Sequence, residues 1–240
     1  MNRKHWLIAA LPHCLIAGLC VPLSAQGAPL PPYQVPATRE PHHDVKLDNR
    51  LVRVLDVTVA PFDGTLYHIH ENPYTYVSIG PATLKAQVLG ASEIVDLNLK
   101  DGEVRFSAAV THRVGNVGST PFRNITIQIQ GKDDTTTNTS ALLAEARALG
   151  PRTEAAFEND LIRVDRFSIA PGAASLPHSH PKSHLLVAYH GSTVKLDATG
   201  YPSVTQPMRP GDFEWRTGAY THTIANTGTT PFDAIEVIWK

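Results

Sequence analysis

The chain has 240 residues, of which 42% are hydrophobic and 18% are charged, a composition that favours a globular protein over a fibrous or disordered one. Lysine and arginine number 21 against 22 acidic residues, so the formal charge of -1 shows no basic surplus that would indicate nucleic acid. A small molecule or a protein is therefore the expected partner.

The first segment of the chain is typical of a secretory signal peptide. A basic start precedes a largely apolar run over residues 6–23, and a small-residue stretch offers a cleavage position before Ala28. The alternative is a membrane anchor, but Pro12, His13 and Pro22 interrupt the run, and a spanning helix needs about 20 consecutive apolar residues. We therefore expect a periplasmic or secreted protein with no stable membrane insertion after signal cleavage.

Cleavage would also remove every thiol. Cys14 and Cys20 both lie within residues 1–27, the expected signal peptide. Cysteine nucleophiles, redox switches and thiolate metal ligands are therefore excluded from the expected mature chain.

A proline-rich arm is expected next, over residues 28–44. Prolines at positions 29, 31, 32, 36 and 41 favour an extended, polyproline-like conformation. His42 and His43 lie at the end of this arm. For both, the sequence favours solvent-exposed side chains over a role in metal binding.

The rest of the chain is a tandem repeat. Residues 159–171 resemble residues 49–61 at an offset of 110, and the same offset aligns three histidines of one copy with three of the other. The aligned pairs are His68 with His178, His70 with His180, and His112 with His222. A repeat at this distance predicts two copies of one structural unit.

Both copies are predicted to be all-β. Apolar residues alternate with others over residues 51–59, and residues 74–79 and 122–130 are rich in β-branched and aromatic side chains bounded by glycine and proline. These patterns favour two small barrels over one sandwich.

The expected boundaries follow from the repeat and from a polar segment between the copies. The first barrel covers residues 45–130 and the second covers residues 155–240. Residues 131–154 form the linker, in which Ser140 as N-cap predicts a short helix over residues 141–149.

The second copy contains the histidine pattern with the clearest chemistry. His178 and His180 are two residues apart and would point to the same face of a strand. His184 follows after three residues, and His222 lies further on, before Asn226. Several imidazoles aimed at one place suit a transition metal better than magnesium or calcium, which prefer oxygen ligands.

This spacing resembles the two-part signature of the cupin superfamily, and nearly all of the expected mature chain resembles a bicupin, two cupin barrels in one polypeptide. In the second barrel the matching positions are Gly172, His178, His180, Gly191, Gly211, His222 and Asn226. His184 stands where the family places a glutamate ligand. The resemblance implies two jelly-roll β-barrels and a metal site formed by His178, His180, His184 and His222.

The first barrel matches the signature less well. His68, His70, His112 and Asn116 fit, and Tyr74 takes the glutamate position. The resemblance implies a second candidate metal site of His68, His70, His112 and Tyr74. Two alternatives stay open: in either barrel, a retired site whose imidazoles hydrogen-bond to each other and to the backbone, and in the first barrel, a Tyr74 ring that serves only as core or pocket wall.

The ion would be a divalent transition metal, namely iron, zinc, copper, nickel or manganese. Without a carboxylate ligand its charge would stay uncompensated, which would attract an anionic substrate such as an enolate or a carboxylate. Histidine-only sites in the superfamily favour dioxygenases, whereas the missing glutamate weakens a resemblance to oxalate decarboxylase.

Two functions follow from the resemblance. The first is an exported metal-dependent enzyme, dioxygenase-like rather than isomerase or lyase, that acts on a small oxygenated metabolite at the second-barrel histidines. The alternative is a non-catalytic module that binds a small ligand or a metal. A homodimer is left open.

The sequence identifies no catalytic residue. Glu71, Glu214 and Glu236 are the nearby acids, and solvation at strand ends explains each equally well. His190 is expected to be solvated. The remaining aromatic residues of note, Trp215 and Trp239, are expected to pack in the core.

Overall fold

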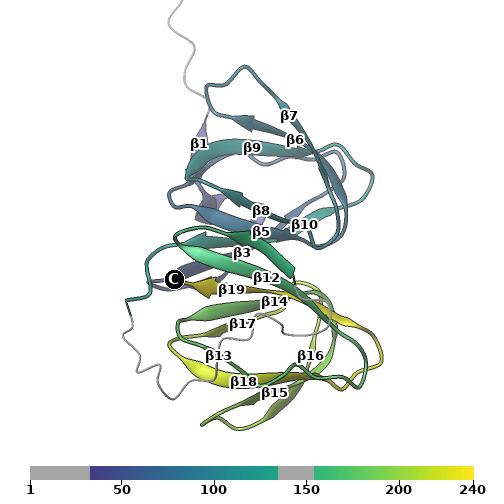
Figure 1. The fold of residues 1–240 in the computed structure, drawn as a ribbon. Coiled ribbons are helices and arrows are strands. Elements are labelled where there is room, and N and C mark those ends of the chain that lie inside the picture. Colours follow the sequence, from purple (N-terminus) through teal and green to yellow (C-terminus); the bar gives the residue numbers. More distant parts are fainter. Residues whose placement is uncertain (1–32, 135–153) are drawn as a thin grey trace, which may run out of the picture. The chain divides into compact units, whose positions relative to one another are not determined.

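The computed structural model of the protein describes residues 33–134 and 154–240. The expected signal peptide over residues 1–27 and the expected linker helix over residues 141–149 lie outside the described residues. The described part is built almost entirely from β-strands (Figure 1). Within it, no helix has the length and apolar character needed to cross a membrane.

The first half of the protein, residues 34–129, forms two five-stranded sheets. Its elements are β1 (Gln34–Pro36), the 3-10 turn η1 (Ala37–Arg39), β2 (His43–Asp48), β3 (Val52–Val59), β4 (Tyr67–His70), β5 (Tyr74–Ser78), β6 (Ala82–Val88), β7 (Val95–Leu99), β8 (Val104–Ser107), β9 (Val110–Asn116) and β10 (Phe122–Ile129). The strand order is β1-β4-β9-β6-β7 in one sheet and β2-β3-β10-β5-β8 in the other. Strands distant in sequence are therefore neighbours, as in a jelly roll.

The second half, residues 154–239, repeats this arrangement. Its strands are β11 (Glu154–Glu158), β12 (Ile162–Ile169), β13 (His178–His180), β14 (His184–His190), β15 (Ser192–Ala198), β16 (Val204–Met208), β17 (Phe213–Arg216), β18 (Tyr220–Asn226) and β19 (Phe232–Trp239). The order is β11-β12-β19-β14-β17 in one sheet and β13-β18-β15-β16 in the other. The described strands of each half thus form two separate sheets, not a closed barrel, because the edge strands of the two sheets do not pair.

Strand alternation sorts the apolar residues into distinct cores. On β19, Phe232 and Ala234 belong to a buried cluster inside the second half, whereas Ile235 and Val237 belong to a cluster that also contains residues of the first half. The first-half members of this shared cluster are Val52, Val54, Val77, Ile125, Ile127 and Ile129. Trp215 and Trp239 pack here as expected, with ring centroids 5.0 Å apart.

A polar contact also joins the two halves. His190, expected to be solvated, is half-exposed, but its Nδ1 lies 2.7 Å from Asp233 and its Nε2 lies 2.5 Å from Asp101 of the first half. The hydrogen bond to Asp233, together with that to Asp101, raises the pKa of the His190 imidazole. Asp101 is 89 residues away in sequence, so no local pattern could reveal this pairing.

The N-terminal residues form a strap rather than a free arm. β1 pairs in parallel with β4, with Val35 opposite His68, and β2 then pairs with β3 in the other sheet. We call residues 34–48 the N-terminal strap, because they connect the two sheets of the first half. The expectation of a solvent-exposed His43 is wrong, since the turn at η1 brings this side chain back into the fold, where only 3% of it is exposed.

Candidate metal centre

Three histidines of the second half meet on one sheet. His178 and His180 lie on β13, where their spacing of two places both side chains on the same face. β13 pairs with β18 in antiparallel register, which puts His222 opposite His178. The Nε2 atoms of His180 and His222 are 3.1 Å apart, and all three side chains are buried.

A glutamate completes this group from the other sheet. Glu236 lies on β19 without exposed surface, and its Oε1 is 3.2 Å from Nε2 of His180 and 3.6 Å from Nε2 of His222. One ligand atom from each of His178, His180, His222 and Glu236 lies within 4.8 Å of the others. The expected histidine-only centre is therefore corrected: a carboxylate is present, supplied by the last strand instead of the motif position.

His184 stands beside this group of four. It begins β14, in the same sheet as β19, and its ring stacks on that of His180 with centroids 4.2 Å apart. Its Nε2 lies 3.6 Å from Oε1 of Glu236. The structure thus brings His184 to the centre, against the carboxylate, and its role as a ligand stays a prediction.

Burial sets the charges of the centre. It lowers the pKa of His178, lowers that of His222 to about 3 and lowers that of His184 well below its usual range. Burial alone would raise the pKa of Glu236, but His180, His184 and His222 together outweigh this effect and hold that pKa below its ordinary value. Neutral imidazoles and an ionised carboxylate are the forms that bind a divalent metal.

A backbone hydrogen bond orients one of the rings. Nδ1 of His178 donates to the carbonyl oxygen of Leu176 at 2.8 Å, which leaves Nε2 as the basic nitrogen. Within the described part of the chain, this buried Nε2 has no hydrogen-bond partner. Such a nitrogen, two further imidazoles and a buried carboxylate together fit a divalent transition metal.

The asparagines of the two signatures, Asn226 and Asn116, have a structural role. Nδ2 of Asn226 donates to the carbonyl oxygens of Ile169 and Thr230, each at 2.8 Å. Asn116 makes the equivalent bond to Thr120 in the first half. These residues hold the turn before the last strand of each half and do not face the histidines.

A small chamber opens beside the second-half histidines. It has a volume of about 10 Å³ and is lined by Glu214 and Arg216 of β17, together with His184 and His222. A wider surface depression of about 340 Å³ also reaches His222. Tyr201, like Ala198 and His222, lines both spaces.

Glu214 has one carboxylate oxygen unused in this chamber. Arg216 pairs with Oε1 of Glu214, and the buried Oε2 has no hydrogen-bond partner among the described residues. Leu186 of β14 lies opposite Glu214 on one side and Glu236 on the other. The two carboxylates therefore share one face of the sheet. Solvation at strand ends is the wrong explanation for both, whereas Glu71 is exposed, as that explanation requires.

The first half brings its histidines together without a carboxylate. His68 and His70 lie on β4, and His112 of β9 is opposite His68, so that one nitrogen of each lies within 4.8 Å of the others. Tyr74 stacks on His70 with ring centroids 4.2 Å apart, and burial raises the pKa of its phenol. Thr126 occupies the repeat position of Glu236.

These first-half rings line a cavity of about 190 Å³. Its other walls are mainly aliphatic and aromatic, and its lining contains neither aspartate nor glutamate. Burial lowers the pKa of His70 to about 2 and that of His112 to about 3, so both imidazoles are neutral. The cavity thus has a wall of neutral histidines, and Arg105 is the charged residue in its lining.

The sequence contained a signal for Glu236 that the motif does not use. Glu236 interrupts the apolar run of residues 232–239, and a carboxylate in a strand buried on both faces needs a partner. The period of two places it on the face of Ala234, toward the interior of the second half. Alternation therefore could have directed it to the histidines.

No protein-family model and no curated protein matches the chain. Among solved structures, AerE from Microcystis aeruginosa is similar over 84% of this chain and 98% of its own, with a TM-score of 0.58 and 11% identity. An oxalate decarboxylase variant from Bacillus subtilis is similar over 79% of this chain and 69% of its own, with a TM-score of 0.56 and 11% identity. Vicilin from Solanum lycopersicum (tomato) is similar over 78% of this chain and 74% of its own, with a TM-score of 0.55 and 12% identity. At these identities the likeness shows the fold, which is that of a bicupin with two tandem cupin-type jelly rolls.

Proposed function

We propose that the protein is an exported metal-dependent enzyme that acts on a small carboxylate at the second-half centre. The observation that carries this proposal is the position of Glu236, which faces the histidines while Glu214 and Arg216 stand on the adjoining strand. A donor set for an ion thus adjoins, through His222, a chamber lined by a proton carrier and an anion-binding group, and these are the parts that a metal-assisted reaction requires.

The ion would be held by His178, His180, His222 and Glu236, with His184 as a further nitrogen donor beside the carboxylate. Three imidazoles and one carboxylate suit iron, zinc, copper and nickel, and the oxygen donor favours manganese more than a histidine-only set would. The oxalate decarboxylase of Bacillus subtilis has Mn(II) centres. When bound, the ion supplies positive charge that polarises an oxygen of the substrate.

Arg216 and Glu214 give the chamber its selectivity. A guanidinium group binds carboxylates through paired hydrogen bonds, so Arg216 would anchor an acid group of the substrate. Oε2 of Glu214, which has no partner among the described residues, would accept or return a proton. The chamber of about 10 Å³ excludes large substrates, and a substrate of a few carbon atoms would enter from the surface depression and widen the chamber as it binds.

The reaction class proposed is cleavage of a C–C bond next to a carboxylate. A dioxygenase-like reaction and a lyase-type decarboxylation both belong to this class and differ in the uptake of dioxygen. The absence of a glutamate was the reason to rank decarboxylation lower, and Glu236 removes that reason. The fold neighbours include an oxalate decarboxylase, which supports testing this chemistry first.

The experiment is an assay of the metal-loaded protein with oxo-, hydroxy- and dicarboxylates of two to four carbons. Dioxygen uptake and carbon dioxide release are recorded together, which separates the two reactions. Glu214→Gln should retain the metal and lose turnover by at least about 100-fold, because proton transfer by a positioned group contributes that much. Equal turnover in the wild type and Glu214→Gln would contradict the assigned role.

The second candidate function is metal or ligand binding without turnover. The observation in its favour is the chamber volume of about 10 Å³, which leaves room for little more than one water molecule. Full metal occupancy with no turnover of any carboxylate would establish this alternative. Export is tested separately by the intact mass of the protein in the culture fluid or periplasm, which should start at Ala28.

A further inference from the structure

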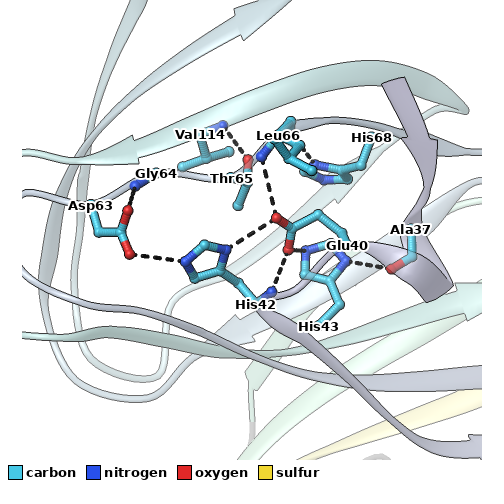
Figure 2. Close-up of polar contacts among 10 residues, drawn as sticks. All are labelled: Ala37, Glu40, His42, His43, Asp63, Gly64, Thr65, Leu66, His68 and Val114. Carbon is cyan, nitrogen blue, oxygen red and sulfur yellow. Dashed lines mark hydrogen bonds and ion pairs between the residues drawn. The ribbon is translucent and has the colours of Figure 1, made fainter. Parts of the chain in front are cut away.

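The sheet of the first half that contains β4 ends in two very different edge strands. At one end lies β1, which is three residues long and includes a proline. The segment after β1 is held by the buried side chain of Glu40, which accepts hydrogen bonds from the backbone N–H of His42 at 2.7 Å and of Leu66 at 3.2 Å (Figure 2). At the other end lies β7, with five residues and no proline (Figure 1). Short strands and prolines prevent a sheet edge from pairing with another chain, and β7 has neither protection.

Most other edge strands of the described part are also protected. A β-bulge interrupts the pairing of β2 with β3 between Val45 and Leu47, and another interrupts that of β11 with β12 between Ala155 and Phe157. β8 lies against the second half, where the ring of Phe106 stacks on that of Phe157 with centroids 4.8 Å apart. β13 and β17 are only three and four residues long.

The peptide groups of Asp96 and Asn98 on β7 point away from their own sheet. Asn98 lies opposite Thr83 of β6, and the carbonyl oxygen of Thr83 accepts a hydrogen bond from the N–H of Val117 at 3.0 Å, on the β9 side. In an antiparallel pair, the peptide groups of two opposite residues either face each other or both face away. Those of Asn98 therefore face the open side, and the period of two places those of Asp96 there as well. No described strand pairs with β7 on that side.

The second half has a proline at the matching place. Pro207 of β16 lies opposite Thr193, whose carbonyl oxygen accepts a hydrogen bond from the N–H of Thr227 at 2.9 Å. Pro207 thus has the position of Asn98, with its nitrogen toward the open side, and proline has no N–H to donate. The edge of the second half is therefore blocked where that of the first half is open.

The sequence of β7 is complementary to itself. Its residues, Val-Asp-Leu-Asn-Leu, alternate between apolar and polar in the same order from either end, with Leu97 in the middle. Antiparallel pairing of two copies about Leu97 would put Asp96 opposite Asn98 of the second copy. An amide would then face a carboxylate on one side of the sheet, and Val95 would face Leu99 of the second copy on the other.

Apolar side chains also gather beside this edge. Val88 at the end of β6, together with Ile94 and Val95 at the start of β7, is about half-exposed. A charged side chain on an edge usually opposes pairing, but Nζ of Lys85 lies 2.6 Å from Oδ1 of Asp96 and neutralises its charge. An open strand edge with apolar residues beside it is typical of a surface that another strand extends.

We propose that two copies of the protein associate through β7, in antiparallel register about Leu97. The two five-stranded sheets then become one continuous sheet across a twofold axis, and both copies contribute the same surface. The outward peptide groups of Asp96 and Asn98 form the main-chain hydrogen bonds of the contact. One short strand and a small apolar patch make a contact below the standard size, so the dimer dissociates at micromolar concentration. This proposal does not depend on the reaction proposed for the second half.

The experiment is sedimentation velocity of the full chain from about 1 to about 100 µM, the range of a weak contact, with amide hydrogen exchange at both ends of the series. Asn98→Pro copies the edge of the second half and removes the outward N–H. Asn98→Asp puts a second carboxylate opposite Asp96, and the double variant Asp96→Asn/Asn98→Asp exchanges the two side chains and restores an amide opposite a carboxylate. The matched control is Thr205→Asp, which adds the same charge to β16.

We expect the wild type to dimerise in this range, with slower exchange of the Asp96 and Asn98 amides at the higher concentration. Asn98→Pro should weaken the dimer by about 10-fold or more, because each copy loses a main-chain hydrogen bond. Asn98→Asp should weaken it by about 3-fold or more, because like charges meet across the strands, whereas the double variant and Thr205→Asp should stay within about 2-fold of the wild type.

Three results would overturn the proposal. The first is a wild type that stays monomeric at the highest concentration. The second is a dimer that forms without slower exchange of the Asp96 and Asn98 amides. The third is dimerisation equal to wild type in Asn98→Pro and Asn98→Asp, both shown to be folded by circular dichroism. A double variant as weak as Asn98→Asp alone would overturn the register about Leu97.

Discussion

The two halves share their strand order and their signature histidines, yet the residues beside those histidines differ. In the second half, Glu236 and His184 fill the space beside the histidines and leave a chamber of about 10 Å³. In the first half, Thr126 and Tyr74 occupy the matching positions, and a cavity of about 190 Å³ remains. Two positions in the repeat thus separate a compact centre with a carboxylate from a wider pocket whose lining has none.

The comparison shows that a histidine motif alone does not define a metal centre. Both halves supply three converging imidazoles, but among the described residues a carboxylate joins them within 4.8 Å only in the second half. That carboxylate comes from β19, which is distant in sequence from the motif on β13. What distinguishes the halves is therefore the residue on the adjoining sheet, and the following experiments act on that difference.

The largest effect is expected for Glu236→Gln. Removal of the only carboxylate should weaken divalent-metal binding in the second half by more than about 100-fold, beyond the loss typical of outer hydrogen-bond partners. Because metal binds only the folded state, the stabilisation by metal should vanish as well, which is about 2.7 kcal/mol at 100 times the dissociation constant. Metal titration and thermal melts with and without metal measure both effects.

The control for this variant is its stability without metal. A buried carboxylate is costly to desolvate, so the amide of similar shape should melt no lower than the metal-free wild type. Glu214→Gln, on the neighbouring strand, should bind metal normally. Unchanged metal affinity in Glu236→Gln would show that the carboxylate does not distinguish the metal binding of the two halves.

His184→Ala should have a smaller effect on the same centre. The four donors within 4.8 Å of each other remain, so the ion should still bind, with affinity reduced by roughly 10-fold through loss of a donor or of the ring that orients Glu236. His184→Tyr copies the first half and separates the two roles, because it retains a stacked ring. An affinity equal to wild type in both variants would show that His184 is neither ligand nor support.

The fold could be predicted from the sequence because strands and repeated units both leave periodic patterns in it. Alternation along segments such as residues 122–130 identifies strands, and the repeat of 110 residues identifies two units. The pairing of sheet edges could not be predicted in this way. Strand patterns do not specify whether a jelly roll closes, so two barrels were expected where separate sheets are found.

The histidines of the motif could be placed together from their spacing alone. Residues that reach them from other parts of the chain could not. His178 and His180 converge because i and i+2 share a face. Glu236 and His43 reach their histidines through sheet packing and through the turn at η1, both of which depend on long-range contacts. Histidine spacing carries no information about either one.

His190 tests whether the halves are coupled by charge, through its contacts to Asp101 and Asp233. Its pKa in the folded protein is raised above the unfolded value of about 6.5, so its stabilising contribution is fully present below that pH and is lost as pH rises through the raised pKa. His190→Gln should therefore lower the melting temperature at pH 5.5 and have no effect at pH 9. The contact is half-exposed, so the difference should not exceed about 1 kcal/mol. A pH-independent difference would assign the effect to packing.

The smallest expected effect concerns the turn that follows β3 in the first half and β12 in the second. Phe62 has a φ of 61°, the only positive value among the described non-glycine residues, and its repeat partner Gly172 has a φ of 75°. An aromatic residue rarely adopts this conformation, and the side chain, which is 77% exposed, has little packing to compensate. Phe62→Gly removes the strain but increases the entropy of the unfolded chain, so the net gain in the free energy of unfolding should stay below about 1 kcal/mol.

Gly172→Ala is the reverse experiment. Its Cβ would meet no atom within 4 Å, so any loss of stability measured by chemical denaturation comes from the backbone alone. If Phe62→Gly destabilises the protein instead, the exposed ring contributes contacts that outweigh its strained backbone, and the two turns are not equivalent.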